Sequence, residues 1–417
     1  MTKYLKRVGF SLRSMVLEIF IKISLKIFKR NTIWFDAQNR SKGAVLIYYK
    51  TDPFATRWLA QTFKHTNNRE IEILVEVCRN LDFDVLLVDR VAKWDEISTY
   101  KKKQFRLFIS NCGGNSAPLH ERIRAEFSGI ETCICYCAGV EPELSNFLVT
   151  KRHLDFEERH GIPVVHRRLV AGTQDNWKRR FRDCSEIWYF GNDFNKGAWE
   201  QKYIQPKKGM LPTAFSPSNS TDLFDLGVKN KYSVMFIGGD GLICKGLDLV
   251  LDLFLSLPKP WELHVFCPTG ENDFWNYYDP LLREVNNIHV YGFVNVSSNR
   301  FRNIASKCLL NLFPSAAEAC ATSVITAMKF GVLPVVTVQC GVDVRQFGYV
   351  LGANVSDELK RILKNVELSS AKSLQKRLIS MRSECEKYSD FMYRQRIQDY
   401  VKSSSTELTD MTEGCSG

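Results

Sequence analysis

Long uncharged apolar runs are missing from this sequence. No stretch approaches the roughly 20 consecutive apolar residues that a membrane-spanning helix requires. A small-residue cleavage site after an apolar core is missing as well, so we expect no signal peptide. The sequence also has no CxxC pair, the spacing found in many zinc sites. These absences argue against a membrane-spanning helix, a secreted precursor and a cysteine-based zinc site.

Cysteine itself is abundant. The chain has 13 cysteines, but the number is odd and several lie in apolar runs, where cysteine acts as a small hydrophobic residue. We therefore expect reduced thiols in a cytosolic compartment and no disulfide framework. Cys133, Cys135 and Cys137 alternate along one predicted strand and would face the same way, so a metal site there is the less favoured alternative.

Length and charge set the broad class of protein. A chain of 417 residues is too long for one ordinary core, which predicts two domains. Hydrophobic residues make up 45% and charged residues 25%, as in a folded protein. The net charge of +11 favours anionic partners in general, namely nucleic acid, acidic lipid or a nucleotide substrate, without choosing among them.

Residues 1–31 form a basic amphipathic segment. Apolar residues recur at helical spacing from Leu5 to Ile27, with Lys and Arg among them and Glu18 as the one acid. Such a helix can lie in the interface of an anionic membrane, or it can pack on the protein's own surface. We favour the first alternative, which predicts peripheral contact with an anionic membrane.

Strand-like apolar runs alternate with helical segments from Gly43 onward, the pattern of doubly wound α/β domains. The expected strands are 44–49, 84–88, 105–110, 131–137 and 185–190, then 232–237, 262–266, 288–291, 309–313 and 332–336. The predicted organisation is a first domain over 42–205, a linker over 206–230, a second domain over 231–385, a C-terminal helix crossing back over 386–403, and a disordered polar tail over 404–417.

The most informative stretch runs from Asn311 to Val344. It predicts a buried strand, a loop with one acid (Glu318), a helix capped by Thr322 or Ser323, a helix end at Gly331 and a second buried strand. The free N–H groups and the dipole of such a helix start attract anions. An anion site beside a single carboxylate indicates an enzyme that holds a phosphorylated donor and acts on the group attached to it.

A glycine-rich loop opens the second domain. Gly238, Gly239 and Gly241 stand between a predicted strand and a predicted helix, and Lys245 precedes that helix. Glycines let the backbone approach a ligand closely, and the lysine could neutralise a diphosphate. The loop matches neither the P-loop nor the dinucleotide fingerprint, so a plain glycine turn with a solvated lysine is the alternative.

A third strand end carries the turn Gly292, Phe293 and Val294. Ligands of open α/β sheets bind beyond the carboxyl ends of the strands. We therefore expect this turn, the glycine loop and the Glu318 loop to share one edge of the sheet, and this convergence is more specific than any one of the motifs.

These motifs resemble the donor-binding half of retaining glycosyltransferases with the GT-B fold, in the large family 4 group. The family's lysine–glycine pair is matched by Lys245-Gly246, and its first glutamate by Glu318. The resemblance continues through 331–343 and, more loosely, into the first half at 50–54, 65–67 and 189–194. It implies an α/β protein of two Rossmann-like doubly wound domains facing a cleft, with no metal and no other cofactor.

The resemblance also implies roles for residues. Glu318 would be the catalytic residue and contact the transferred sugar, while Lys245 and the helix start would stabilise the departing diphosphate. The implied donor-binding residues are Gly238, Gly239, Gly241, Lys245, Gly292, Phe293, Val294, Thr322, Ser323, Val324 and Thr326. Two positions depart from the family: Thr326 replaces a second glutamate that commonly contacts the donor's ribose, and Asp240 stands near the place of a glycine-loop arginine.

Acceptor-side candidates lie in the first half. Gly113 and Gly114 follow a predicted strand, and His65 and His120 could supply polar groups there, with a structural role as the alternative. Asp82 and Asp84 resemble a metal-binding Asp-x-Asp, but they precede a strand, so we predict no metal there.

The basic residues at 167–168 and 178–180 are expected on a solvated face, with contact to an acidic acceptor or a lipid surface as the alternative. The predicted function is a retaining, hexosyltransferase-like enzyme. It would move a sugar from a nucleotide sugar to a cell-envelope glycan or lipid-linked acceptor at the cytoplasmic face of the membrane. An inert sugar-nucleotide-binding or scaffold protein is the alternative, because of Thr326 and the missing arginine. Nucleic acid is not expected as a partner, because no recognised binding module is present.

Overall fold

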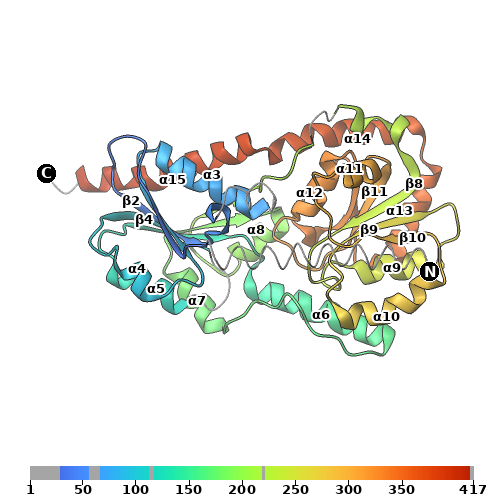
Figure 1. Ribbon diagram of the computed structural model, residues 1–417, viewed down its shortest axis with the longest axis horizontal. Helices are drawn as coiled ribbons and strands as arrows, with labels where there is room; N and C mark the ends of the chain where they lie inside the picture. The colour runs from blue at the N-terminus through green and yellow to red at the C-terminus, as the bar shows by residue number, and fades with distance from the viewer. Residues whose placement is uncertain (1–28, 56–65, 112–116, 218–220, 414–417) are drawn as a thin grey trace. The chain divides into compact units, whose positions relative to one another are not determined.

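The computed structural model describes residues 29–55, 66–111, 117–217 and 221–413. They form two compact units, each with its own mainly parallel sheet and helices on both faces (Figure 1). Of the described residues, unit 1 contains 143–169 and 214–388, and unit 2 contains 29–142, 170–213 and 389–413. Residues 143–169 therefore do not belong with the first domain that we predicted over 42–205.

The sheet of unit 2 has the strand order β1-β3-β2-β4-β5-β6-β7. The short edge strand β1 runs antiparallel to β3, and the other neighbours are parallel. The strands are β1 Thr32–Phe35, β2 Ala44–Tyr49, β3 Asp84–Asp89, β4 Phe105–Asn111, β5 Thr132–Cys137, β6 Glu186–Phe190 and β7 Lys207–Met210. Strands β2 and β5 are buried along their whole length, as expected for strands covered on both faces.

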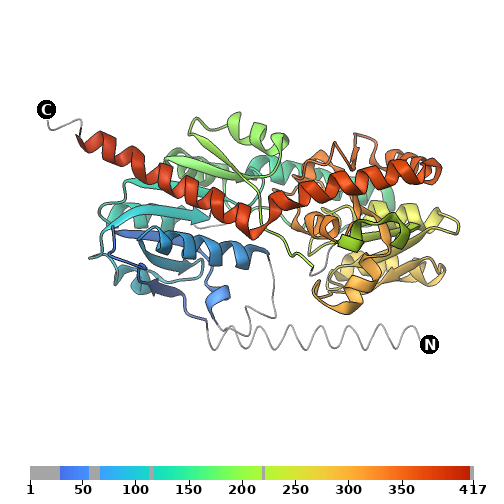
Figure 2. The same ribbon diagram turned by 90° about the horizontal axis from the view of Figure 1, so that it is seen from above.

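The helices of unit 2 include a long C-terminal one. They are α3 Thr66–Asn80, α4 Trp94–Ser98, α5 Ala117–Glu126, α7 Gln174–Arg182, α8 Asp193–Glu200 and α15 Asp390–Glu413. Helix α15 lies along α3 (Figure 2). The ion pair between Arg394 and Glu76 joins the two helices, with Nη2 and Oε2 2.8 Å apart.

The sheet of unit 1 is entirely parallel, in the order β10-β9-β8-β11-β12-β13. Its strands are β8 Asn230–Ile237, β9 Glu262–Phe266, β10 Ile288–Val290, β11 Cys308–Phe313, β12 Leu333–Thr337 and β13 Tyr349–Leu351. Its helices are α6 Pro142–His160, α9 Leu247–Ser256, α10 Asn272–Arg283, α11 Asn299–Ala305, α12 Thr322–Lys329, α13 Val355–Leu368 and α14 Ala371–Cys385. The strand order reverses between β8 and β11, which makes their carboxyl ends the place where such sheets bind ligands.

Three strands were not predicted, namely β1, β7 and β13. Strand β7 has the polar sequence KKGM and lies at a sheet edge, so it lacks the apolar pattern of a central strand. It falls inside the predicted linker over 206–230, which is therefore wrong at its start. The predicted disordered tail over 404–417 is wrong up to Glu413, because α15 continues to that residue.

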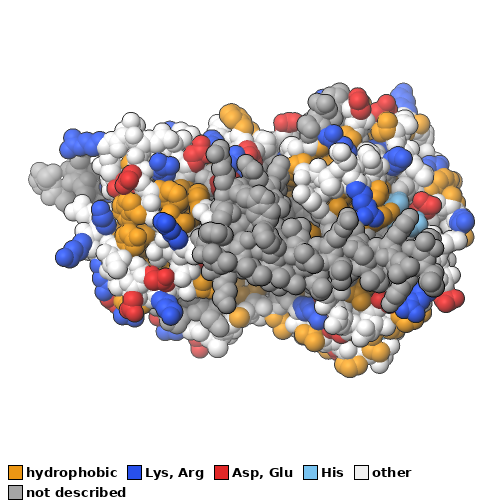
Figure 3. Space-filling model, in the orientation of Figure 1, with side chains coloured by type: hydrophobic (Ala, Val, Ile, Leu, Met, Phe, Trp, Pro, Cys, Tyr) orange, Lys and Arg blue, Asp and Glu red, His pale blue; other side chains and the backbone are white. Residues whose placement is uncertain are grey.

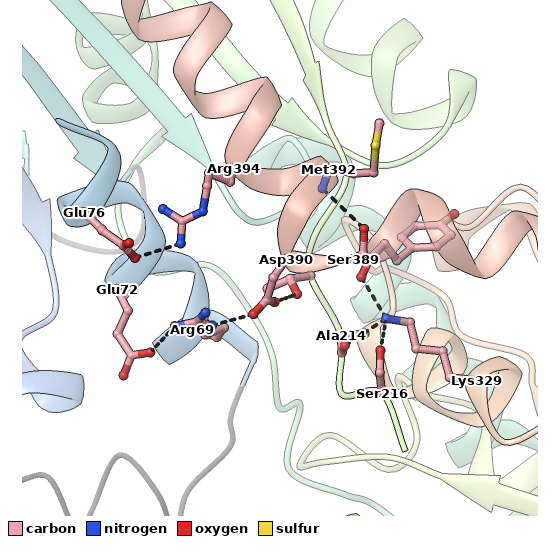
Figure 4. A network of polar contacts seen from close by, with 12 residues as sticks. Arg69, Glu72, Glu76, Ala214, Ser216, Lys329, Ser389, Asp390, Met392 and Arg394 are labelled. Atoms are coloured by element: carbon pink, nitrogen blue, oxygen red, sulfur yellow. Dashed lines mark hydrogen bonds and ion pairs between the residues drawn. The ribbon is translucent and has the colours of Figure 1, made fainter. Parts of the chain in front are cut away.

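The chain passes from one unit to the other at residues 213–214 and 388–389, and polar contacts within each unit fix the residues next to these two points. In unit 1, Lys329 at the end of α12 donates to the carbonyls of Ala214 and Tyr388, both at 2.9 Å, and to the Ser216 hydroxyl at 2.8 Å (Figure 4). In unit 2, Arg69 binds Asp390 at 2.7 Å, and Asp390 also accepts from Thr213. Residues at both passages are therefore fixed within their own units.

The structure also shows where the cysteines of β5 and the basic side chains lie. Cys133, Cys135 and Cys137 are buried in β5, and none of them forms a disulfide bond with a described residue. On the face shown in Figure 3, the Lys and Arg side chains of the described residues are dispersed. Within the described residues no helix is long and apolar enough to cross a membrane. The predicted interfacial segment 1–31 lies outside the described residues except for its last three.

Candidate functional site

The buried side chain of Glu271 fixes the backbone of the loop after β8. Glu271 accepts hydrogen bonds from the backbone N–H groups of Gly241 and Leu242, the latter at 3.2 Å. Arg167 lies 3.8 Å from Glu271 and binds Asp273 at 2.8 Å. Burial raises the pKa of Glu271 against these contacts. The glycine loop is therefore positioned by the Glu271 carboxylate, which already accepts from the N–H groups of residues 241 and 242.

The Glu318 loop, residues 314–321, is fixed at several backbone points. Ala316 N–H donates to the Cys244 carbonyl at 2.7 Å, Glu318 N–H donates to the Gln339 carbonyl at 2.9 Å, and Ala321 N–H donates to the Cys340 carbonyl at 2.9 Å. Because these bonds tie the loop to the segments that follow β8 and β12, the position of Glu318 is fixed relative to the sheet. The loop follows β11, as the sequence predicts, and the sheet order places β11 directly beside β8.

Two cations meet the Glu318 carboxylate. Buried Lys245 donates to Oε1, and the Nη2 atom of Arg168 lies 3.5 Å from Oε2. Burial alone would raise the pKa of Glu318, but the charges of Lys245 and Arg168 outweigh it and lower that pKa. Glu318 is therefore ionised at neutral pH and can stabilise positive charge.

Helix α12 begins one residue earlier than a Thr322 or Ser323 cap would allow. The N-cap is Ala321, which has no side-chain cap bond, so Thr322 and Ser323 occupy the first helical positions and the prediction of either as N-cap is wrong. The backbone bond from Ala321 to Cys340 fixes the helix entry in place of a side-chain cap. At the other end Gly331, with φ of 70°, forms the predicted glycine stop.

Other donor-side candidates have distinct surroundings. The Thr326 hydroxyl donates to the Thr322 carbonyl at 2.8 Å within the helix, and Val324 is fully buried. Gly292, Phe293 and Val294 follow β10, which lies two strands from β8 in the sheet order. They share the carboxyl edge with Glu318, and Phe293 exposes 49% of its surface there.

Comparison with known proteins identifies the architecture. No family model matches the chain. A glycogen synthase of Thermodesulfovibrio yellowstonii is 28% identical over 142 residues, which span 33% of this chain and only 28% of that protein. The crystal structure of HepE from Anabaena with UDP and glucose aligns with a TM-score of 0.56 and 14% identity, over 87% of this chain and 100% of that one.

A second solved structure, WaaG, is described as a glycosyltransferase involved in lipopolysaccharide biosynthesis. It aligns with a TM-score of 0.55 and 13% identity, over 86% of this chain and 99% of that one. The two alignments cover 87% and 86% of the chain, and each unit contains a mainly parallel sheet. The chain has the GT-B fold.

Of the four residues predicted on the acceptor side, the structure describes only His120. His65, Gly113 and Gly114 lie outside the described residues. His120 is buried in unit 2, with Nε2 3.5 Å from the Cys133 sulfur and its ring 4.9 Å from that of Phe108. Burial, with a smaller contribution from Arg180, lowers the pKa of His120 to about 3. His120 is therefore a neutral core residue, which is the structural alternative.

The basic residues at 167–168 and 178–180 have different surroundings from one another. The expectation of a solvated face is wrong for Arg180, which is buried, and for Arg167, which is mostly covered and binds Asp273. It holds in part for Arg168, which exposes 43% of its side chain while it contacts Glu318. Arg168 is the functional candidate that the sequence missed. Its partner Glu318 is 150 positions away, and no local spacing connects them. A basic pair followed by a glycine-containing turn was the one available signal.

Proposed function

We propose that this chain is a retaining glycosyltransferase that moves a sugar from a nucleotide-diphosphate sugar to a cell-envelope glycan or lipid-linked acceptor. The observation that carries the proposal is the ionised Glu318, held between Lys245 and Arg168 beyond β8 and β11, where the strand order of the sheet reverses. The fold is shared with HepE, whose structure holds UDP and glucose, and with WaaG, a glycosyltransferase by its description.

The groups suit the chemistry of glycosyl transfer. The bond between the anomeric carbon and the diphosphate oxygen breaks, a bond to the acceptor oxygen forms, and the acceptor proton passes to the departing diphosphate. Positive charge develops at the anomeric carbon, where the Glu318 carboxylate would stabilise it. Negative charge develops on the diphosphate, where Lys245 and the N-terminus of α12 would stabilise it.

Metal is not part of the proposed mechanism, because Lys245, Arg168 and the helix N-terminus already provide positive charge at the leaving group. The same proposal places the enzyme in the cytoplasm, at the inner face of the membrane, where the basic segment 1–31 would contact anionic lipid. The acceptor would then be presented at that surface.

A second candidate function is an inert sugar-nucleotide-binding protein. Thr326 favours it, because its hydroxyl is engaged with the Thr322 carbonyl inside the helix and is largely buried. A group in that state offers little to a ribose.

One assay separates the two candidates. A panel of nucleotide sugars is tested for donor hydrolysis and transfer with the wild type, Glu318→Ala and the control Glu262→Ala, whose side chain is exposed on β9. We expect Glu318→Ala to lose at least about a hundredfold in rate, as for removal of a charge-stabilising group, and Glu262→Ala to keep full rate. Nucleotide binding without release of sugar under any condition would favour the inert protein.

A further inference from the structure

Arg168 has an unusual backbone. It and Asp82 are the non-glycine residues with positive φ in the described part of the chain, and the φ of Arg168 is 73°. This left-handed conformation is unfavourable for a residue with a Cβ atom, and it persists where surrounding contacts impose it, often at functional sites. A plain surface turn would more simply place a glycine there.

The neighbours of Arg168 enforce this position. Arg167 is held by Asp273, and the same Asp273 accepts from the Val165 N–H at 2.8 Å. On the other side, a Cβ atom at Gly241 would lie 2.3 Å from the Arg168 Cγ atom, so the arginine stem packs where only a glycine leaves room. The segment and the glycine loop therefore fit together around the Arg168 side chain.

The charged end of Arg168 stays accessible. Its side chain exposes 43% of its surface while Nη2 lies 3.5 Å from Glu318. The guanidinium thus lies over the ionised acid with one side open to solvent. Lys245 approaches the same carboxylate from the β8 side and is largely buried. One carboxylate therefore faces two cations, and the trio carries a net positive charge.

We propose that Arg168 is a second diphosphate-binding cation, and that the donor's diphosphate displaces Glu318 from Arg168 and Lys245. This inference rests on the proposed function. A guanidinium offers two parallel N–H groups that match phosphate oxygens, whereas a lysine acts as a point charge. Binding of the diphosphate by both cations frees the Glu318 carboxylate to face the sugar. Before donor binding, the same carboxylate neutralises the cations.

The test uses calorimetric titration of the full chain with UDP, GDP and ADP, and with the matching nucleosides. The variants are Arg168→Gly, Arg168→Lys and the control Arg361→Ala on the exposed face of α13. Glycine suits the left-handed backbone, so Arg168→Gly should keep or raise the melting temperature. Loss of one charge-assisted contact should weaken binding of the diphosphate by about 10–100-fold and leave nucleoside binding unchanged. The affinity of Arg168→Lys for the diphosphate should lie between those of the wild type and Arg168→Gly, and the affinity of Arg361→Ala should equal that of the wild type.

The outcomes are distinguishable. If the wild type binds none of the three diphosphates, the proposed function and this inference both fail. If the wild type binds one of them and Arg168→Gly binds it equally well, the inference alone fails. A lowered melting temperature with unchanged affinity would show that Arg168 is only a structural residue.

Discussion

Lys245 donates a hydrogen bond to Glu318, and the two side chains belong to loops that follow adjacent strands. The lysine exposes 7% of its side chain and the acid 13%, so both charges are poorly solvated and each helps to neutralise the other. Because both would also contact the donor, ligand binding must rearrange this pair. The strength of the Lys245–Glu318 contact should therefore influence the affinity for the donor.

Replacement of Glu318 by Gln should tighten binding of a nucleoside diphosphate. The substitution removes the carboxylate that competes with phosphate for Lys245 and Arg168. We expect affinity to rise about tenfold, roughly the energy of one charged contact, while sugar transfer falls. Titration calorimetry measures the affinity, with Glu262→Gln as the matched control. Weaker binding by Glu318→Gln at unchanged melting temperature would contradict the exchange of partners.

Gly331→Ala should destabilise the chain by about 2–3 kcal/mol. Gly331 has φ of 70°, and a Cβ atom there would lie 1.8 Å from the Leu223 carbonyl oxygen, which is backbone and cannot move easily. Gly270→Ala is the control, because a Cβ atom there meets nothing within 4 Å. Urea unfolding gives both free energies. Equal effects at the two glycines would refute the proposed steric cause.

Lys329→Met should lower the free energy of unfolding by about 3 kcal/mol, because the carbonyls of Ala214 and Tyr388 and the Ser216 hydroxyl lose the ammonium that donates to them. Lys372→Met on the exposed face of α14 should change stability by less than about 0.5 kcal/mol. Thermal and urea unfolding measure both variants. A neutral Lys329→Met would mean that the Ala214 and Tyr388 carbonyls find other partners at no cost.

Glu70 should make stability depend on pH. Burial raises the pKa of Glu70 to about 7, against the charge of Lys50 and a hydrogen bond from Tyr136. The folded state therefore holds a proton that the unfolded state releases, so this contribution is present below about pH 4.5 and is lost as pH rises through 7. The shift corresponds to about 3 kcal/mol. Between pH 4.5 and 7.5, the free energy of unfolding measured in urea should decrease less for Glu70→Gln than for the wild type. Parallel curves for the two proteins would disprove the raised pKa of Glu70.

Deletion of residues 1–31 should abolish sedimentation with anionic liposomes if the basic segment lies in the membrane interface. Liposomes of neutral lipid serve as the control, because they lack the surface charge that attracts Lys and Arg. Unchanged sedimentation of the shortened chain would place the contact elsewhere or remove it.

The central strands were predictable from sequence because burial on both faces leaves continuous apolar runs such as AVLIYY at 44–49 and DVLLV at 84–88. Strand β7 was not, since an edge strand with the sequence KKGM carries no such signal. The residues of the candidate site also differ in whether a local sequence pattern marks them. Glu318 and Lys245 stand in recognisable local motifs, whereas Arg168 reaches Glu318 through a contact that only the folded chain creates.

The helix start at α12 shows a further limit of local patterns. Thr322 and Ser323 are good caps in isolation, but the backbone bond from Ala321 to the Cys340 carbonyl sets the helix entry one residue earlier. The expected boundaries of the first domain failed for a related reason. Arg159 of α6 binds Asp248 and Asp252 of α9, about 90 positions away, and sequence reasoning has no access to such pairs.

Because the described part of unit 1 comes from two separate stretches of chain, this unit cannot be excised as one continuous piece. A fragment covering 214–388 would keep Lys245 and Glu318 but lose Arg168. It would also leave Asp248, whose side chain is fully buried, without the charges of Arg152 and Arg159. An uncompensated buried carboxylate is strongly destabilising. A recombinant half-protein or a domain exchange between relatives would therefore have to carry residues 143–169 along, joined out of their natural order.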